Sequence, residues 1–205
     1  MTLTISPGRI ADTTAAARLL ADTMAGFGVA VLGAGDEQLE LKALQRWYGE
    51  KDNRFSHQFS NIARLDGEVA GLLLCFPGRD VPGLTKGCVR SILSIYRFGQ
   101  LVKLTWRGMV LGRAKEAEND EFLIAHLAVF ESYRRKGIAR AMLDNAVLRA
   151  REAGLSRVVL EVEIGNTAAI MLYEGYGFKT QFTTDFGRHK HILNCPGYHK
   201  MLLEL

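Results

Sequence analysis

The sequence predicts an α/β fold, because segments with strand character and segments with helical character alternate along the chain. An almost uninterrupted apolar run at residues 122–130 has the length of a buried strand. A polar turn containing Gly137 follows, and apolar residues then recur at roughly helical intervals across 140–153. A second apolar segment at 157–164 completes a unit of strand, helix and strand.

The N-terminal part of the chain adds further strands and helices. Asp66-Gly67 lies between two apolar segments, 59–65 and 68–76, and is a strong signal for a tight β-hairpin. The other elements expected here are a strand at 3–5 and helices at 9–25 and 36–48.

Composition favours one globular domain. The chain has 205 residues, of which 48% are hydrophobic and 23% charged, and this is enough to bury a substantial core. No apolar run approaches the ~20 residues of a membrane-spanning helix. The N-terminus also lacks the charged segment followed by an apolar segment that is typical of a signal peptide. The net charge of +4 suits an anionic cofactor without calling for nucleic acid.

The cysteines predict neither a disulfide framework nor a metal site. Cys75, Cys88 and Cys195 are widely spaced, which favours reduced, unpaired thiols and excludes the common zinc spacings. We therefore expect a cytoplasmic protein without a metal ion.

The turn before the helix of 140–153 has the properties of a phosphate-binding site. A helix that starts here has free backbone amides at its first turn, and its dipole adds positive potential. Four cationic side chains add charge at the same place: Arg134, Arg135, Lys136 and Arg140. A plain strand, turn and helix with a solvated basic turn is the alternative. The sequence contains neither a Walker motif nor a dinucleotide fingerprint here, which disfavours nucleotide hydrolysis and hydride transfer.

Two motifs together resemble the GNAT superfamily of N-acetyltransferases. Arg134-x-x-Gly137-x-Ala139 matches its acyl-CoA pyrophosphate loop. The second signature is matched by Asn166-x-x-Ala169-x-x-Leu172-Tyr173-Glu174-x-x-Gly177-Phe178. The segment 198–205 is similar to the closing strand of the family. The resemblance implies a mixed, mostly antiparallel central sheet with helices on both faces, one N-acetyltransferase domain over 1–205, and an acyl-CoA-binding core at 121–178.

The resemblance also implies acetyl-CoA as the co-substrate and names the residues that hold it. In the family, the fourth and fifth strands separate and the pantetheine arm pairs with the fourth, here through the backbone of Leu127 and Val129. Asn166 has two possible roles, because it can cap the following helix or hydrogen-bond the pantetheine or thioester. The pyrophosphate is expected on Arg134, Arg135, Lys136, Gly137, Ile138, Ala139 and Arg140.

Tyr173 occupies the position of the family's general acid. A phenol with a pKa near ~10 is protonated at neutral pH and can return a proton to a thiolate whose parent thiol has a pKa near ~8.5. The alternative role for Tyr173 is a tyrosine packed beneath its helix.

The general base is less well defined. His126 interrupts an apolar strand, and its ordinary pKa near ~6.5 suits proton removal at neutral pH, although a structural role is the alternative. Glu161 and Glu163 share one face of the next predicted strand, and Glu121 precedes the strand of His126. We predict that the catalytic residues are Tyr173, His126 and Glu163. A water chain without a single base is a further alternative.

An insert at 77–120 precedes the cofactor-binding strand. It has no acidic residue between 81 and 115, and its apolar residues suggest two helices broken near Phe98-Gly99, each with an apolar and a basic side. Its functions could be a packed flap, a lid over the acceptor, or contact with an anionic membrane surface, RNA or acidic protein. The basic residues are Lys86, Arg90, Arg97, Lys103, Arg107, Arg113 and Lys115.

These observations predict an N-acetyltransferase that moves an acetyl group from acetyl-CoA to a primary amine. A small-molecule amine is the first expectation, and a protein N-terminus or lysine is the alternative. A non-catalytic acyl-CoA sensor would belong to a different class. No nucleic acid is expected as a partner, and a homodimer is left open.

Overall fold

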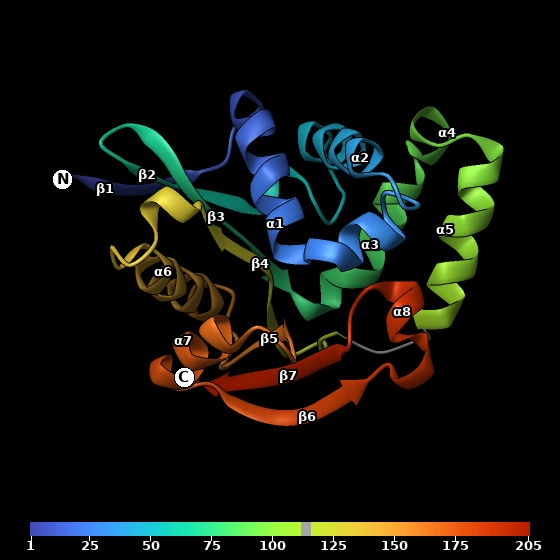
Figure 1. Cartoon of the computed structure of the whole chain (residues 1–205). Coiled ribbons are helices and arrows are strands. Elements are labelled where there is room, and N and C mark those ends of the chain that lie inside the picture. The colour runs from blue at the N-terminus through green and yellow to red at the C-terminus, as the bar shows by residue number, and fades with distance from the viewer. Residues whose placement is uncertain (112–115) are drawn as a thin grey trace.

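The computed structural model describes residues 1–111 and 116–205, and side chains 107–111 are outside the description. The described strands form one seven-stranded sheet in the order β1-β2-β3-β4-β5-β7-β6 (Figure 1). Only β4 and β5 are parallel among the neighbouring strands, which confirms the mixed, mostly antiparallel sheet. The strands are β1 (Leu3–Pro7), β2 (Ser60–Leu65), β3 (Glu68–Pro77), β4 (Phe122–Val129), β5 (Arg157–Glu163), β6 (Lys179–Asp185) and β7 (Gly197–Glu204).

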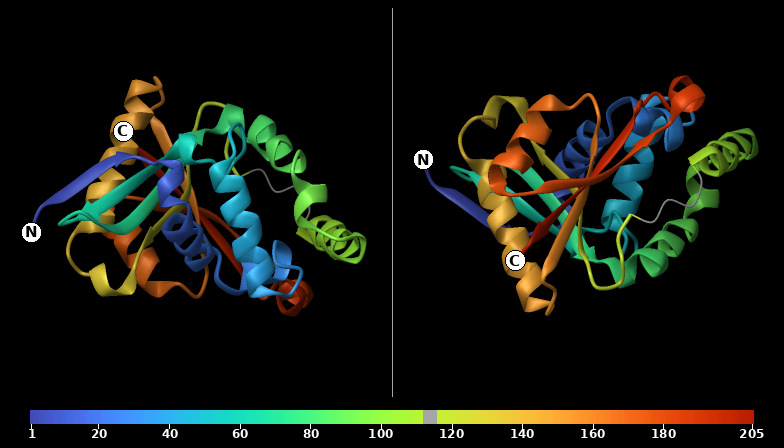
Figure 2. Two further views of the ribbon diagram at one scale, coloured as in Figure 1. Left: turned by 90° about the horizontal axis from the view of Figure 1, so that it is seen from above. Right: turned by 90° about the horizontal axis from the view of Figure 1, so that it is seen from below.

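Helices cover both faces of the sheet, as predicted. α1 (Thr13–Val31) and α2 (Glu37–Gly49) bury their apolar sides in a core that includes Leu72 and Leu74 of β3. α6 (Ile138–Glu152) and α7 (Thr167–Tyr176) pack in a second core on the other face, where Figure 2 shows them in gold and orange. The short α8 (Lys190–Leu193) packs beside α1. Within the described residues, no helix is both long enough and apolar enough to span a bilayer.

The predicted hairpin is present. β2 and β3 pair across Asp66 and Gly67, whose φ angles of 52° and 91° both lie in the left-handed region. A two-residue hairpin turn of the I′ type needs positive φ at both positions, and glycine adopts it without steric cost.

The first helix differs from the prediction. We expected it to end at Ala25, but α1 continues to Val31 across a break at Ala25, where φ is 44° and ψ is −134°. Gly26 and Gly28 follow the break, and a Cβ on either would collide with the side chain of Asn194 or Glu40 respectively. These glycines therefore permit close packing of the second half of α1.

The described part of the insert forms three α-helices, so the prediction of two is wrong; the chain breaks beside Phe98, at residues 96–97, as predicted, but it also breaks at residues 90–91. They are α3 (Val81–Val89), α4 (Ile92–Ile95) and α5 (Phe98–Leu111), drawn in green in Figure 1. The chain turns after α4 because Tyr96 is anchored to the domain: its hydroxyl donates to the carbonyl oxygen of Leu32 over 2.8 Å. The indole of Trp47 likewise donates to the carbonyl oxygen of Cys88 over 3.1 Å. The basic residues Arg113 and Lys115 lie outside the described residues, as does the side chain of Arg107.

A β-bulge in β4 turns His126 toward α1. Leu74 pairs with His126 and Cys75 with Ile124, which leaves Ala125 as an extra residue. In a regular strand, His126 would lie on the same face as Ile124, two residues earlier, which packs in the core on the α6 side of the sheet. The bulge instead places His126 on the α1 face, where its ring packs against Phe55.

Candidate active site

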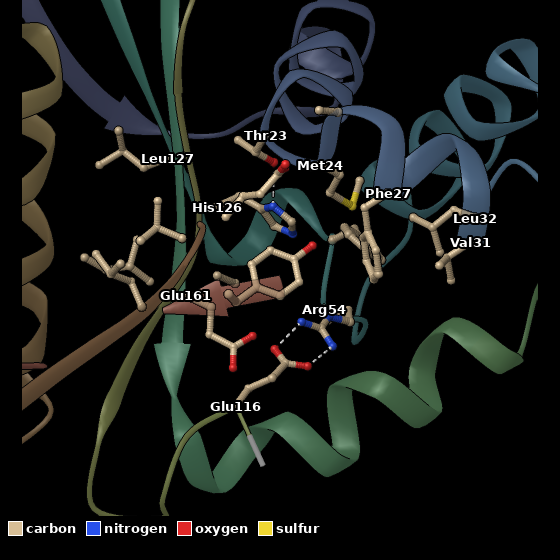
Figure 3. Close-up of a pocket in the computed structure, with 18 of the residues that line it drawn as sticks. Thr23, Met24, Phe27, Val31, Leu32, Arg54, Glu116, His126, Leu127 and Glu161 are labelled. Atoms are coloured by element: carbon tan, nitrogen blue, oxygen red, sulfur yellow. Dashed lines mark hydrogen bonds and ion pairs between the residues drawn. The ribbon is translucent and has the colours of Figure 1, made fainter. Parts of the chain in front are cut away.

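A cavity of about 580 Å³ opens where β4 and β5 separate. The last residue pair between these strands is Ile124 with Leu160, so the rest of β4 has β3 as its only paired strand in the described sheet. The expected splitting of the two strands is therefore confirmed. The cavity is lined by side chains from α1, the insert, β4, β5, α7 and the β6–β7 region. Figure 3 shows part of this lining.

The turn after β4 has the conformation expected of a phosphate-binding turn. We call residues 134–139 the basic glycine turn. Gly137 is the N-cap of α6 with a φ of 77°, and no side chain caps this helix. A Cβ added at Gly137 would meet no atom within 4 Å, so the space above the first amides of α6 is open. Arg134, Arg135 and Lys136 are exposed around it. These residues fit an anionic pyrophosphate.

The cavity and the basic glycine turn lie along the same strand. The cavity contacts Ala125, His126 and Leu127, whereas the turn begins beyond the last residue of β4, Val129. Arg134 donates from Nε to the carbonyl oxygen of Val129 over 3.1 Å, which fixes the turn to the strand end. An extended ligand could thus have a phosphate at the turn and a reactive end in the cavity.

Tyr173 of α7 lines the cavity and is buried. Burial raises the pKa of Tyr173 to about 12, so its hydroxyl is protonated across the neutral range. The ring packs edge-on against Phe178 with centroids 5.8 Å apart, which restricts its orientation. Tyr173 therefore combines the two properties that a proton donor in the cavity requires.

Asn166 caps α7, as one of its two predicted roles required. Its Oδ1 accepts a hydrogen bond from the backbone N–H of Ala169 over 3.2 Å. Asn166 and Ala169 both line the cavity. The predicted contact of Asn166 with pantetheine or thioester stays a prediction, and its amide nitrogen is the atom available for that contact.

His126 lies in the cavity wall, but its environment disfavours proton uptake. Burial, and next the positive charge of Arg54, lower the pKa of His126 to about 3. The neutral imidazole is a poor base for an ammonium group. Among the described residues, its Nε2 is buried and has no hydrogen-bond partner.

The hydrogen bonds of Thr23 assign the tautomer of His126. The Thr23 hydroxyl donates to the carbonyl oxygen of Leu20 over 2.7 Å, and its oxygen lies 2.7 Å from Nδ1 of His126. Because the single hydroxyl hydrogen is committed to Leu20, Thr23 must accept from Nδ1–H. Nε2 then carries a lone pair that no group among the described residues uses.

Sequence reasoning missed an ion pair next to His126. Arg54 donates to both carboxylate oxygens of Glu116 over 2.8 and 2.6 Å (Figure 3). Burial alone would raise the pKa of Glu116, but the charge and hydrogen bonds of Arg54 outweigh burial and lower it. Neither residue belongs to a motif, and 62 positions separate them, so no local pattern could have found the pair.

Glu161 of β5 points toward this ion pair in Figure 3. Burial in the protein, and then the negative charge of Glu116, raise the pKa of Glu161 to about 7, although Lys200 and Arg54 oppose the rise. Its side chain is nevertheless accessible from the cavity, which it lines. A cavity carboxylate that titrates near neutral pH has the ordinary properties of a general base.

The other two glutamates considered as bases differ in position. Glu163 also lines the cavity, on the same face of β5 as Glu161, while Val162 packs in the opposite core. Glu121 does not line the cavity. Its Oε2 accepts from Nζ of Lys200 over 2.9 Å, and the two side chains are only 2% and 4% exposed. This carboxylate therefore belongs to a buried structural ion pair.

The residues that the structure describes contain no cluster of three or more histidine, cysteine or acidic side chains able to hold a metal ion.

Known proteins resemble this chain in sequence and in fold. Ribosomal protein bS18 alanine N-acetyltransferase of Escherichia coli strain K12 is 34% identical over 80 residues, which are 36% of this chain and 54% of that protein. The chain thus spans about half the length of this curated relative. An N-acetyltransferase from Staphylococcus aureus Mu50 has a TM-score of 0.75 at 20% identity, over 98% of this chain and all of that one.

A second solved structure is the PaiA N-acetyltransferase of Thermoplasma acidophilum in complex with coenzyme A. Its TM-score is 0.56 at 12% identity, with both chains fully covered. Residues 30–178 of this chain match the model of the acetyltransferase (GNAT) family. This match includes the separated strands, the basic glycine turn and Tyr173, and the chain therefore belongs to the GNAT acetyltransferase family.

Proposed function

We propose that the chain transfers an acetyl group from acetyl-CoA to a primary amine. The observation that carries this proposal is the cavity at the β4–β5 split, which has Tyr173 in one wall and Glu161 in another. Membership of the family and the coenzyme A bound to the Thermoplasma neighbour support acetyl-CoA as the donor. We also propose that residues 1–205 act as one domain, with an insert at 77–120 and an acyl-CoA-binding core at 121–178.

The donor is held by backbone groups and by charge. The first amides of α6, at Ile138, Ala139 and Arg140, receive the pyrophosphate, and the cations of the basic glycine turn neutralise it. The pantetheine arm pairs with the backbone of Leu127 and Val129, where β4 has no β5 partner in the described sheet. This arrangement holds the thioester near the acceptor and so raises its effective concentration.

Two side chains move protons at the reacting atoms. Glu161 takes a proton from the acceptor ammonium, because its pKa of about 7 lets it be ionised while still basic enough to accept. Tyr173 donates its phenolic proton to the departing thiolate sulfur. Glu163 remains the alternative base on the same cavity wall. His126 stays neutral and contributes its ring to the cavity wall around the acceptor.

The cavity favours a cationic acceptor that also carries an apolar group. Among the described residues, its charged lining comprises one cation, Arg54, and four carboxylates, Asp22, Glu116, Glu161 and Glu163. The remaining wall is largely aliphatic and aromatic, with contributions from Phe27, Val31, Leu32, Ile92 and Leu104. Because helices of the insert close one side of this cavity, we propose a small-molecule amine as the first acceptor class.

A protein N-terminus is the second candidate. The Escherichia coli relative is named for acetylating the alanine of a ribosomal protein. An N-terminal peptide would place its α-amine near Glu161 and its first side chain against the apolar wall. It would also have to leave the cavity as an extended chain, whereas a small amine would be enclosed.

A thiol-release screen tests the function. The full chain would be incubated with acetyl-CoA and a panel of aryl-alkyl and alkyl amines, polyamines, amino acids and N-terminal peptides. We expect release with apolar primary amines, no release with matched tertiary amines, and an acetylated product by mass spectrometry. Calorimetric binding of acetyl-CoA without release across the panel would instead indicate a sensor, and absence of binding would refute the donor site.

A further inference from the structure

The insert exposes an apolar stripe on the side that faces away from the cavity. Its members are large hydrophobic side chains with exposed fractions between 49% and 82%. We call them the outer insert face: Leu93, Phe98, Val102 and Trp106. Isolated exposed hydrophobic residues are ordinary, but a contiguous group of this kind indicates an interaction surface.

Helix geometry makes the stripe continuous. Phe98, Val102 and Trp106 are four residues apart along α5, so they lie above one another on one side of the helix. Leu101 and Leu104 of the same helix instead pack against the protein core. The insert is therefore already anchored by its inner side, and packing among the described residues leaves these outer side chains exposed.

Positive charge accompanies the apolar side chains. Lys86 of α3, Lys103 of α5 and Arg97, between α4 and α5, are exposed, and the sequence contains no acidic residue from position 81 to 115. Arg90 is also exposed, and its guanidinium lies 3.8 Å from the carboxylate of Asp52. The surface is thus apolar and cationic at once.

We propose that the outer insert face docks on an anionic lipid bilayer surface. Leucine, phenylalanine and tryptophan side chains can enter the boundary between head groups and acyl chains, while lysine and arginine contact anionic head groups. A second copy of the chain fits less well, because a symmetric contact would place Lys103 and Arg97 of both copies close together. RNA would use the cations but would leave aliphatic side chains such as Val102 and Leu93 without a partner.

Vesicle flotation of the full chain tests the docking. We expect flotation with vesicles that contain phosphatidylglycerol and much weaker flotation with phosphatidylcholine alone. Phe98→Ser with Val102→Ser should weaken binding at least ~10-fold, because two apolar side chains no longer enter the bilayer. The matched control is Leu148→Ser with Met171→Ser, which changes two exposed apolar residues on α6 and α7 and should bind as the unmodified chain does.

The cationic contribution can be measured separately. Lys103→Gln and Arg97→Gln should each weaken binding to phosphatidylglycerol vesicles about fivefold at low salt, and added salt should reduce this difference. Equal binding to neutral and anionic vesicles would contradict the electrostatic part of the proposal.

Tryptophan fluorescence locates the contact. The chain has two tryptophans, and Trp47 is buried whereas Trp106 belongs to the outer insert face. Bilayer contact should therefore shift Trp106 emission to the blue, and lipids brominated in the acyl chain should quench it. Trp106→Phe should retain flotation and lose both signals.

Several outcomes would overturn the proposal. They are failure to float with either vesicle type, flotation without quenching of Trp106, and a concentration-dependent dimer in light scattering that Phe98→Ser with Val102→Ser abolishes. Salt-sensitive RNA binding without vesicle binding would also overturn it. None of these measurements depends on the acetyl-transfer assay.

Discussion

Glu161→Gln should remove the acidic limb of the pH–rate profile. In the unmodified chain, the active form of Glu161 is the carboxylate, and burial with the nearby charge of Glu116 raises the pKa of Glu161 to about 7. Activity should therefore be low below this pKa, rise as Glu161 loses its proton, and level off above it. His126, with a pKa lowered to about 3, stays neutral throughout this range and contributes no limb.

The size of the effect follows from the titration of one group. With a pKa of about 7, Glu161 is half ionised at pH 7 and about one tenth ionised at pH 6, so the rate should fall about tenfold per pH unit on the acidic side. Glutamine cannot accept the proton, and loss of a general base typically lowers turnover by ~10²–10⁴-fold. Glu116→Gln should move the limb to lower pH, because it removes a negative charge that raises the pKa of Glu161.

The assay is kcat/KM against pH for the unmodified chain and the two variants, with an acceptor identified by the thiol-release screen. Glu163→Gln is the matched control, since it makes the same chemical change two residues away on the same cavity wall. Carbon-13 labelling of the glutamate carboxyls gives an independent reading by NMR. Burial raises the pKa of Glu40 to about 7 as well, so two resonances should titrate near pH 7, and only one of them should be absent in Glu161→Gln.

Three results would refute the assignment. A limb that persists in Glu161→Gln would belong to the acceptor amine or to another group. A limb that disappears in Glu163→Gln would make Glu163 the base, as the sequence predicted. A resonance of Glu161 that titrates in the ordinary range of carboxylates would contradict the environment that the structure gives it.

Three further substitutions test other parts of the site and fold. Tyr173→Phe should lower turnover by ~10²-fold or more, because the phenolic proton is lost. The affinity for acetyl-CoA, measured by calorimetry, should stay nearly unchanged, because the packed ring is kept. Full turnover of this variant would exclude Tyr173 as the acid. Gly137→Glu should weaken acetyl-CoA binding at least ~10-fold more than Gly137→Ala. Both variants carry a side chain at a φ of 77°, but only glutamate adds negative charge beside the phosphates. Equal acetyl-CoA affinities of the two variants would contradict the phosphate site. Lys200→Met should cost at most ~3–5 kcal/mol in the free energy of unfolding by urea denaturation, because the buried Glu121 carboxylate loses its ammonium partner and keeps only Arg157, whose Nη1 lies 4.0 Å from its Oε1. Lys200→Met with Glu121→Gln should recover most of that loss, and a double variant no more stable than the single one would contradict the ion-pair argument.

The parts of the fold that follow local rules could be predicted from the sequence. Asp66-Gly67 predicted the hairpin because few residue pairs adopt positive φ twice in succession. Asn166 was predicted as a cap from residue type alone. The basic glycine turn combines glycine, charge and a helix start within six residues, and its conformation is confirmed. In each case the physical cause lies within a few positions of the residue concerned.

The breaks in α1 and the insert could not be predicted in this way. Tyr96 ends its segment through a hydrogen bond to Leu32, 64 positions away. Gly26 and Gly28 serve close packing against α8 and α2, although the same residue type commonly marks the end of a helix. These features depend on tertiary contacts, so a sequence pattern could indicate helical character without locating the boundaries.

His126 and Glu161 show why residue type alone does not assign a base. The ordinary pKa values favour His126, because imidazole titrates near neutral pH and a carboxylate does not. The cavity reverses this order through one physical effect, since burial disfavours the charged form of each residue. It lowers the pKa of the imidazole, which is charged when protonated, and raises the pKa of the carboxyl, which is charged when deprotonated. The neighbouring charges add to this effect. The cation Arg54 lowers the pKa of His126 further, and the anion Glu116 raises the pKa of Glu161 further. The cavity therefore favours the carboxylate over the imidazole as the base in the mechanism that we propose.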